Sequence, residues 1–482
     1  MTTLIRHATI VTGDDDGSIH YDSALAIAGN RILAIGPDAD LAAQHPGAEE
    51  VDATGRVVLP GFANIHTHLV MTLARGVFED LSPPHEPPFC GGLSPIPLPP
   101  LSVAEQTVMC QLGALEAIRS GTTAVLEDAA GIEGYAQAMV DTGLRMVLAE
   151  RCWDRTGASI GDPTEFRRDA AVGHAGLARI ERLHAKWHGA GQGRITVGVS
   201  AWAPDMCSTE LLREVRALQM RLDTICTIHL NQIWGEVAAV QAHHNMLPSE
   251  YLDSIGFLHD RMVAAHCRCM APLEEKILGR HKVHVAFNSA IAARRGLSPR
   301  VCEMEQAGCN IGIGTDNMAE DMVEAMRTGL FMERIRRKDG RNPAPEEALR
   351  WATRNGYKAM GVAGGGWLAP GNLADLIMLR TGRAHLAPFL RAVSVFVHQG
   401  QAADIDDVMV DGRWIMRDRV VLTMDEPRIL REAEEVASRA WARLFAENPD
   451  YAVPPGFRPL PAAGADGIAR VAMQPVASPR AG

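Results

Sequence analysis

The middle of the chain alternates short apolar segments with longer amphipathic ones, and this rhythm limits the possible folds more than any other feature. One amphipathic segment begins at the capping box Ser102-Val-Ala-Glu105, runs to about Arg119 and ends at Ser120-Gly121, which predicts a helix. Strands that alternate with helices pair in parallel, and about eight such units close into a barrel. We therefore predict an α/β fold built around a (β/α)8 TIM barrel, with strands at 123–126, 145–149, 195–199, 225–229, 262–266, 283–287 and 310–314.

The two ends of the chain have a different pattern. Residues 1–58 contain short strand-like segments separated by Asp- and Gly-rich turns. Such a meander cannot bury its inner face alone, so it needs partner strands from elsewhere. Strand-like segments recur at 374–379, 393–397 and 408–415. We predict one small β domain that is assembled from both ends of the chain.

These patterns divide the chain into four parts. Residues 1–58 form the first half of the β domain, 59–364 the barrel, 365–430 the second half of the β domain, and 431–482 a C-terminal helix with an extended tail. Within the barrel, residues 82–100 contain eight prolines. A long irregular loop in a compact domain is usually functional, so we expect it to contact substrate, and the alternative is a passive surface connection.

Charge and composition exclude several classes of partner. The net charge of −11 over 482 residues argues against a nucleic acid or an anionic membrane as the partner, because phosphate repulsion would be uncompensated. The chain contains no run of 18 apolar residues, so no transmembrane helix is predicted, and the N-terminus lacks a secretion signal. The nine cysteines are scattered, which fits free thiols in the cytoplasm. We expect a small-molecule substrate.

The first candidate metal ligands are two histidines at alternate positions. His66 and His68 directly follow the apolar run Val57-Val-Leu-Pro-Gly-Phe62. Residues i and i+2 of an extended segment point the same way, so both imidazoles can bind one ion. Such a pair occurs by chance in many chains, and it becomes informative only together with further ligands.

Further ligand-type residues stand at the ends of later predicted strands. His229 ends the strand at 225–229, His266 ends the strand at 262–266, and Asp316 follows the strand at 310–314. The active site of a (β/α)8 barrel is built where its strands end, so these side chains are expected to meet. We predict a single divalent metal ion bound by His66, His68, His229 and Asp316. Zn²⁺ is favoured, with Fe²⁺ and Mn²⁺ as the alternatives.

This set of residues predicts hydrolysis. A metal ion lowers the pKa of a bound water from about 15.7 towards about 7. Asp316 is expected to take the proton from that water, and His266 to polarise the substrate carbonyl or stabilise the oxyanion. Both are therefore predicted to be catalytic. The reaction would be hydrolysis at an sp² carbon or replacement of a leaving amine.

Seven sequence segments resemble the amidohydrolase superfamily, more narrowly its cytosine-deaminase and triazine-hydrolase (chlorohydrolase-like) branch. The resemblance covers nearly all of residues 1–430. It implies a distorted (β/α)8 barrel with a β-sandwich formed by both termini, a mononuclear metal site at the four predicted ligands, and a homo-oligomer. The segments are Leu59-Pro-Gly-Phe-Ala-Asn-Ile-His-Thr-His-Leu69, Arg119-Ser-Gly-Thr-Thr123, Ala265-His-Cys267, Gly314-Thr-Asp316, Ala352-Thr-Arg-Asn-Gly356, Pro370-Gly-Asn-Leu-Ala-Asp375 and Val410-Asp-Gly-Arg413.

The chain departs from the resembled branch at several positions. Deaminases of that branch have a Glu as proton shuttle three residues after the strand-five His, where this chain has Gln232. An amide cannot titrate, so Gln232 can orient water or substrate but cannot carry a proton. Trp202 and Phe287 stand where the family often has histidines. With Asn288, these residues are predicted to bind the substrate, and the aromatic rings favour a fairly apolar one.

Glu236, four residues beyond Gln232, is a second candidate for the missing proton shuttle. We expect instead that it lies on the following helix and faces solvent. The leading prediction for the function is hydrolysis of a C–N bond in a small amide, urea, carbamate or similar molecule. The alternatives are an aminohydrolase acting on a purine, pyrimidine or triazine ring, and a metal-binding protein with weakened catalysis.

Overall fold

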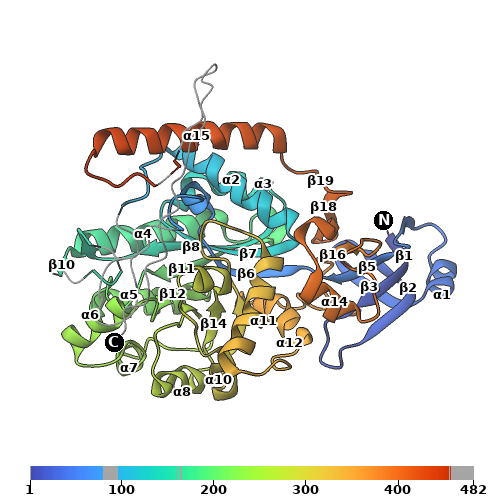
Figure 1. Ribbon diagram of the computed structural model, residues 1–482, viewed down its shortest axis with the longest axis horizontal. Coiled ribbons are helices and arrows are strands. Elements are labelled where there is room, and N and C mark those ends of the chain that lie inside the picture. Colours follow the sequence, from blue (N-terminus) through green and yellow to red (C-terminus); the bar gives the residue numbers. More distant parts are fainter. Residues whose placement is uncertain (1, 80–95, 159, 163–165, 455, 458–482) are drawn as a thin grey trace.

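The computed structural model describes residues 2–79, 96–158, 160–162, 166–454 and 456–457. Its largest part is the predicted barrel, and its strands lie in one sheet in chain order (Figure 1). Every neighbouring pair in this sheet is parallel. The strands are β6 (Phe62–Thr67), β7 (Thr122–Ala129), β8 (Arg145–Cys152), β11 (Ile195–Ala201), β12 (Cys226–Leu230), β13 (Met262–His266), β14 (His284–Phe287) and β15 (Asn310–Ile313).

The barrel closes between its first and last strands. Thr67 and Asp316 form a parallel bridge, and the backbone N–H of Asp316 donates to the carbonyl of His66 at 3.0 Å. The backbone N–H of His68 in turn donates to the carbonyl of Asp316 at 2.8 Å. The two segments that carry predicted metal ligands are therefore bound directly to each other by backbone hydrogen bonds.

Helices cover the outside of the barrel, as the alternating pattern predicts. The predicted helix at 102–119 is confirmed, and Ser102 and Glu105 form the capping box. The barrel helices are α2 (Val103–Arg119), α3 (Ala136–Asp141), α4 (Ala170–Trp187), α5 (Thr209–Leu222), α6 (Trp234–His244), α7 (Pro248–Ser254), α8 (Pro272–Arg280), α9 (Ser289–Arg294), α10 (Val301–Ala307), α11 (Met322–Arg337), α12 (Pro345–Ala352) and α13 (Arg354–Ala359), with the short helices η1 (Leu69–Ala74), η2 (Ile132–Gly134) and η3 (Gly191–Gly193) and the small hairpin β9 (Arg155–Thr156) and β10 (Arg167–Arg168).

The two chain ends form one nine-stranded sheet beside the barrel (Figure 1). The halves join where β16 pairs antiparallel with β5. An apolar core that includes Ile5, Leu25, Val58 and Met378 draws side chains from both halves. The strands are β1 (Thr2–Val11), β2 (Ile19–Ala28), β3 (Arg31–Pro37), β4 (Glu49–Asp52), β5 (Arg56–Pro60), β16 (Leu376–Arg380), β17 (Ile405–Val410), β18 (Arg413–Arg417) and β19 (Val420–Val421), and the helices of this part are α1 (Asp38–Gln44), α14 (Ala392–Gln399) and η4 (Ala402–Asp404).

Two predicted strands in the second half are wrong. The segment 393–397 lies within helix α14. Its buried residues are Ala392, Val393, Phe396 and Val397, which recur with helical spacing, and Phe396 stacks on Phe62 of β6 with ring centroids 6.2 Å apart. Packing against the barrel has outweighed the strand preference of its valines. The segment 408–415 is two strands, because Asp411 and Gly412 adopt φ of 53° and 72° and turn the chain between them.

The last described helix, α15 (Glu426–Glu447), packs over α2 and begins before the predicted boundary at residue 431 (Figure 1). The division into four parts stays a prediction, and β5 crosses its first boundary. Most of the proline-rich segment 82–100 and most of the predicted extended tail lie outside the described residues. Within the described part of the chain, no helix combines the length and the apolar character needed to span a membrane.

Candidate metal centre

Three of the predicted ligands are histidines, and the Nε2 atom of each lies in one small cluster with Asp316. Nε2 of His229 lies 3.3 Å from Nε2 of His68, and Nε2 of His68 lies 3.4 Å from Oδ1 of Asp316. Nε2 of His66 is 3.8 Å from the same carboxylate oxygen. The structure thus brings together His66, His68, His229 and Asp316 at the C-terminal ends of β6, β12 and β15, as the sequence predicts.

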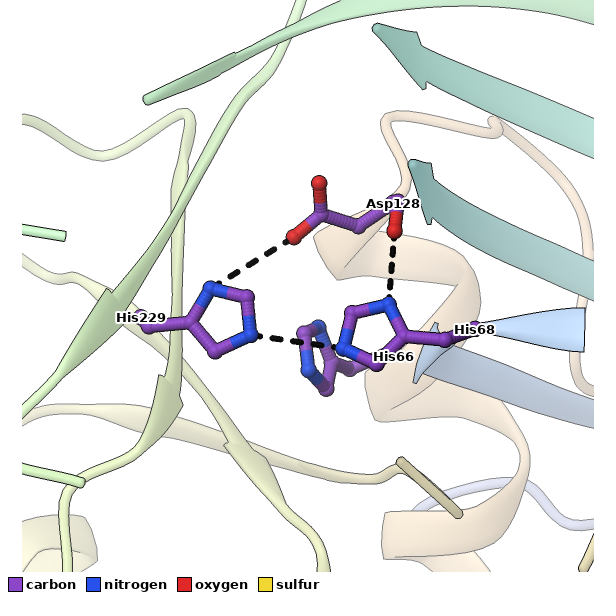
Figure 2. A group of neighbouring side chains, drawn as sticks. All are labelled: His66, His68, Asp128 and His229. Atoms are coloured by element: carbon purple, nitrogen blue, oxygen red, sulfur yellow. Dashed lines mark hydrogen bonds and ion pairs between the residues drawn. The ribbon is translucent and has the colours of Figure 1, made fainter. Parts of the chain in front are cut away.

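The opposite ring atoms of two histidines are already bound. Nδ1 of His68 lies 2.6 Å from the carbonyl oxygen of Asp128, and Nδ1 of His229 lies 2.9 Å from that of Trp202. A carbonyl oxygen can only accept, so each Nδ1 carries the proton and each Nε2 presents a lone pair. Figure 2 shows His68 and His229 with these Nε2 atoms facing each other. Fixing the tautomer from behind is typical of histidines that bind metal.

The cluster leaves buried polar atoms without partners. Both ring nitrogens of His66 and both carboxylate oxygens of Asp316 have no hydrogen-bond partner in the described part of the chain. Burial lowers the pKa of His66, His68 and His229, so the imidazoles are neutral at pH 7 and able to coordinate. Unsatisfied buried polar groups cost free energy, and a cation among three imidazoles and a carboxylate would satisfy them. These residues therefore fit a divalent metal ion such as zinc.

Asp128 is a further buried carboxylate that the sequence analysis missed. It is close enough to His66, His68 and His229 to share an ion with them. However, its Oδ2 is 3.6 Å from Nδ1 of His229, and its Oδ1 accepts from Ser200 and Arg151 at 2.7 and 3.1 Å. Figure 2 shows it on the Nδ1 side of the two rings. The lone pairs face the other way, towards Asp316, which favours Asp316 over Asp128 as a ligand and a positioning role for Asp128.

Asp128 could have been found from the sequence. The predicted strand at 123–126 was three residues too short, since β7 continues to Ala129. With the correct end, Asp128 follows the same rule of polar residues at strand ends that identified His229 and Asp316.

His266 lies beside the cluster and is held by Asn288. The side-chain Nδ2 of Asn288 lies 3.0 Å from Nδ1 of His266, and Nδ1 of His266 is 3.9 Å from Oδ2 of Asp316. An amide NH₂ donates, so Nδ1 of His266 accepts and the proton of the neutral ring is on Nε2. That N–H has no partner in the described residues. Asn288 therefore contacts His266, which presents a hydrogen-bond donor beside the metal ligands.

The backbone at the centre is strained and tightly packed. His266 and Asp316 have φ of 80° and 70°, a left-handed conformation that side chains rarely adopt. Gly314 is required for close packing, because a Cβ there would come within 2.2 Å of Oδ1 of Asn288 and 2.9 Å of the His66 carbonyl. Strained residues of this kind concentrate at functional sites.

A buried acid holds the two ligand segments together. Glu320 accepts from the hydroxyls of Thr67 and Thr315 at 2.6 and 2.8 Å and from the amide of Asn64 at 3.1 Å. Thr67 lies between His66 and His68, and Thr315 directly precedes Asp316. Burial raises the pKa of Glu320 well above its ordinary value. Through these bonds Glu320 holds β6, which carries His66, against the turn after β15, which carries Asp316.

Gln232 and Trp202 are neighbours of His229, since Gln232 lies three residues after it and the carbonyl of Trp202 accepts from its Nδ1. Gln232 is buried, and its Oε1 has no partner among the described residues. Trp202 is half-buried and meets Trp153 edge to face at 5.3 Å between ring centroids. The two tryptophans directly follow the last residues of β8 and β11, so they form an aromatic wall beside the strand ends.

Two expectations about neighbouring residues are corrected. Glu236 does not face solvent but is fully buried, and its carboxylate accepts from the backbone N–H groups of Asn231 and Gln232 at 2.8 and 2.7 Å. It positions Gln232 and has no free oxygen aimed at the imidazoles. Phe287 points away from the cluster, because it packs on Trp351 of α12 in the layer between strands and helices.

A cavity of about 800 Å³ lies away from this centre, at the end of the barrel where β15 starts. Its lining includes Asn310, Arg354 and Lys358, and it contains none of the clustered histidines. In barrels of this kind that end serves stability, whereas the chemistry occurs at the strand C-termini. We therefore place the active site at the imidazole cluster.

Comparison with known proteins identifies the family. Residues 57–415 match the amidohydrolase family, and residues 24–48 match an imidazolonepropionase-like composite domain of bacteria. A 5-methylthioadenosine/S-adenosylhomocysteine deaminase of Pelotomaculum thermopropionicum is 32% identical, over 90% of this chain and 98% of that protein. A 5'-deoxyadenosine deaminase of Methanothermobacter thermautotrophicus is 33% identical, over 90% and 99%.

Solved structures show the same fold. An adenosine deaminase from Xanthomonas campestris with bound zinc has a TM-score of 0.80 at 23% identity, covering 91% of this chain and 98% of that one. Atrazine chlorohydrolase from Arthrobacter aurescens, complexed with zinc, has a TM-score of 0.78 at 19% identity, covering 90% and 100%. The chain belongs to the amidohydrolase family and is a metal-dependent hydrolase that acts on carbon–nitrogen bonds.

Proposed function

We propose that this chain binds one zinc ion through His66, His68, His229 and Asp316 and hydrolyses a C–N bond at an sp² carbon of a small molecule. The observation that carries the proposal is the convergence of three imidazole Nε2 atoms and a carboxylate that accepts no hydrogen bond from a described residue, in one buried cluster. When bound there, a divalent metal supplies Lewis acidity, which makes a water nucleophilic at neutral pH and polarises the group under attack.

The chain's own residues then supply proton transfer and charge stabilisation. Asp316 takes the proton of the attacking water and returns it to the departing nitrogen, because its carboxylate has no other partner among the described residues. His266 donates a hydrogen bond from its Nε2–H to the oxygen or ring nitrogen on which negative charge develops, and it keeps that proton. The C–N bond breaks, and the products are an amine or ammonia and a carbonyl compound.

Gln232 takes part without transferring a proton. The backbone N–H of Gln232 donates to Glu236, and its side-chain oxygen, which has no partner among the described residues, would accept from a substrate N–H. Trp202 and Trp153 would pack against an apolar or planar part of the substrate. This arrangement supports substrates such as amides, ureas and carbamates.

A second candidate is deamination of a purine ring. It is favoured by the relatives named as deaminases of 5-methylthioadenosine, S-adenosylhomocysteine and 5'-deoxyadenosine, which match about nine-tenths of this chain. Hydrolysis at the carbon that carries an exocyclic amino group is the same chemistry with ammonia as the leaving group. Gln232 argues against this candidate, because an amide cannot serve as the proton shuttle that a Glu provides in deaminases of the resembled branch.

The experiment is a substrate screen with zinc-loaded protein. Adenine nucleosides, aminotriazines, amides, ureas and carbamates are incubated separately, and ammonia and primary amines are measured. Ammonia from the aminoheterocycles alone would select the deaminase, and release of ammonia or an amine from amides, ureas or carbamates would select the leading proposal. Activity should disappear after chelation and return with zinc. Full activity in the metal-free protein would contradict both.

A further inference from the structure

Arg268 is a buried cation that the mechanism above does not use. It lies two residues after His266, beyond the C-terminal end of β13, and only 6% of it is exposed. Its Nε donates to the carbonyl of Gln232 at 3.0 Å. Its Nη1 and Nη2 have no hydrogen-bond partner, and no carboxylate lies within ion-pair distance among the described residues.

Backbone hydrogen bonds fix the position of the Arg268 main chain. The N–H groups of Arg268 and Cys269 donate to the carbonyl of Asn231 at 3.0 and 2.9 Å. Together with the bond from Nε to Gln232, this attaches the arginine to the segment that directly follows His229. Arg268 therefore belongs to the same end of the barrel as the metal ligands, and Asp316 is one of the charges that act on it.

The charges around Arg268 do not neutralise it. Its charged neighbours include a second cation, Arg295, as well as the carboxylates of Asp316 and Glu236. Burial lowers the pKa of Arg268 to about 10, so the side chain keeps its charge at neutral pH. Both nearby carboxylates have other roles, since Glu236 is bound to two backbone N–H groups and Asp316 faces the imidazoles.

A buried arginine elsewhere in this chain shows how a buried guanidinium is usually paired with carboxylates. Arg145 is equally buried, and its guanidinium donates to Asp375 at 2.8 and 3.2 Å and to Asp411 at 3.1 Å. Burying a charged group without such partners costs several kcal/mol. An arginine with two unused NH₂ groups beside a catalytic centre is therefore suited to an anion that arrives from outside.

We propose that Arg268 binds a carboxylate of the substrate through Nη1 and Nη2, at a fixed distance from the C–N bond that is cleaved. A carboxylate can accept two N–H groups of one guanidinium side by side, and this pairing is strong and directional. The inference rests on the proposed function and narrows it. The substrate would have a planar or apolar part against Trp202 and an anionic end, so "fairly apolar" describes only one side of it.

Binding is tested separately from hydrolysis. N-acetylglycine, hippurate and N-acetylphenylalanine are each compared with the corresponding primary amide, which differs only in lacking the charge. Titration calorimetry uses zinc-loaded wild-type protein, Arg268→Met, Arg268→Lys and the exposed control Arg431→Met. Phenyl phosphate is included to distinguish a phosphate site from a carboxylate site.

For wild type and Arg431→Met, we expect at least one carboxylate to bind about tenfold more tightly than its amide, as for a charged hydrogen bond. The preference should fall to less than about twofold in Arg268→Met and be partly kept in Arg268→Lys. The melting temperature of Arg268→Met should not fall, because an unpaired buried charge has been removed.

Several results would overturn the proposal. They are equal binding of all acids and amides to wild type, a preference that survives in Arg268→Met, and a larger Arg268-dependent gain for phenyl phosphate. A lowered melting temperature in Arg268→Met with an unchanged preference would show that the arginine is structural. Failure of the proposed function would appear instead as absent hydrolysis with intact, Arg268-dependent carboxylate binding.

Discussion

Two buried clusters of charged residues in this chain differ in how completely their carboxylates are hydrogen-bonded. Where the barrel meets the terminal sheet, Asp375 accepts from Arg145, from the hydroxyl of Tyr357 at 2.8 Å and from the backbone of Asp411. At the other end of the barrel strands, Asp316 is just as buried, and its carboxylate accepts no hydrogen bond from a described residue. Burying charge costs free energy in both clusters, but only in the first does the protein itself supply hydrogen-bond partners for the buried carboxylate.

This contrast is more informative than burial alone. A complete cluster stabilises the fold, and removing one member leaves its partners unsatisfied. An incomplete cluster is held in place by the rest of the fold and is completed by a ligand. The two regions should therefore respond oppositely to matched substitutions.

The largest expected effect is on catalysis, from Asp316→Asn. Loss of the carboxylate should lower kcat/KM by about 10²–10⁴-fold, because an amide cannot take the proton of the attacking water. The metal-free variant should be no less stable than metal-free wild type in urea. Unchanged activity with metal still bound would show that Asp316 has no catalytic role.

The matched change in the complete cluster is Asp375→Asn. It should lower the free energy of unfolding by about 3 kcal/mol, because it leaves the buried guanidinium of Arg145 underpaired. Turnover per folded, zinc-loaded chain should stay close to wild type. The contrast between the two clusters would be wrong if Asp375→Asn were as stable in urea as wild type but had lost its turnover.

Asp128→Asn tests the assignment of a positioning carboxylate. If Asp128 acts from behind the rings of His68 and His229, its loss should weaken zinc affinity about 10–100-fold without abolishing binding. Competition with a chromogenic chelator measures this directly. Ser200→Ala, which removes only the 2.7 Å bond to Asp128, should have a smaller effect in the same direction. Complete loss of zinc from Asp128→Asn would instead make Asp128 a ligand.

The smallest effect is expected from Glu236→Ala. This change leaves the N–H groups of Asn231 and Gln232 unsatisfied and should cost about 1–3 kcal/mol in unfolding free energy. Zinc content should be unchanged, because Glu236 does not reach the imidazoles. A larger loss of turnover than in Gln232→Ala would mean that Glu236 carries a proton after all.

Much of this architecture follows from local patterns in the sequence. Alternating strands and helices predict the barrel, and polar residues at strand ends such as His229 and Asp316 predict where its chemistry occurs. Residues 393–397 show where such reasoning fails, because a short run rich in valine suits a strand or a buried helix equally, and only contact with Phe62 decides.

The other features that the sequence does not predict concern the direction in which side chains point and the partners they find. Phe287 directly precedes Asn288, yet it faces the helices whereas Asn288 contacts His266. Glu236 lies in the first turn of α6, where a carboxylate can face solvent or fold back onto backbone N–H groups. The unpaired state of Arg268 depends on residues far apart in the chain, so no local pattern could indicate it.

The central claim is that the incomplete cluster binds one metal ion. The most direct test is the metal content of chelator-treated, zinc-reloaded protein, measured by mass spectrometry for wild type, His229→Ala and the exposed control His174→Ala. We predict one zinc per chain in wild type and His174→Ala, and little or none in His229→Ala. Equal zinc in all three, or two ions per chain in wild type, would contradict the account.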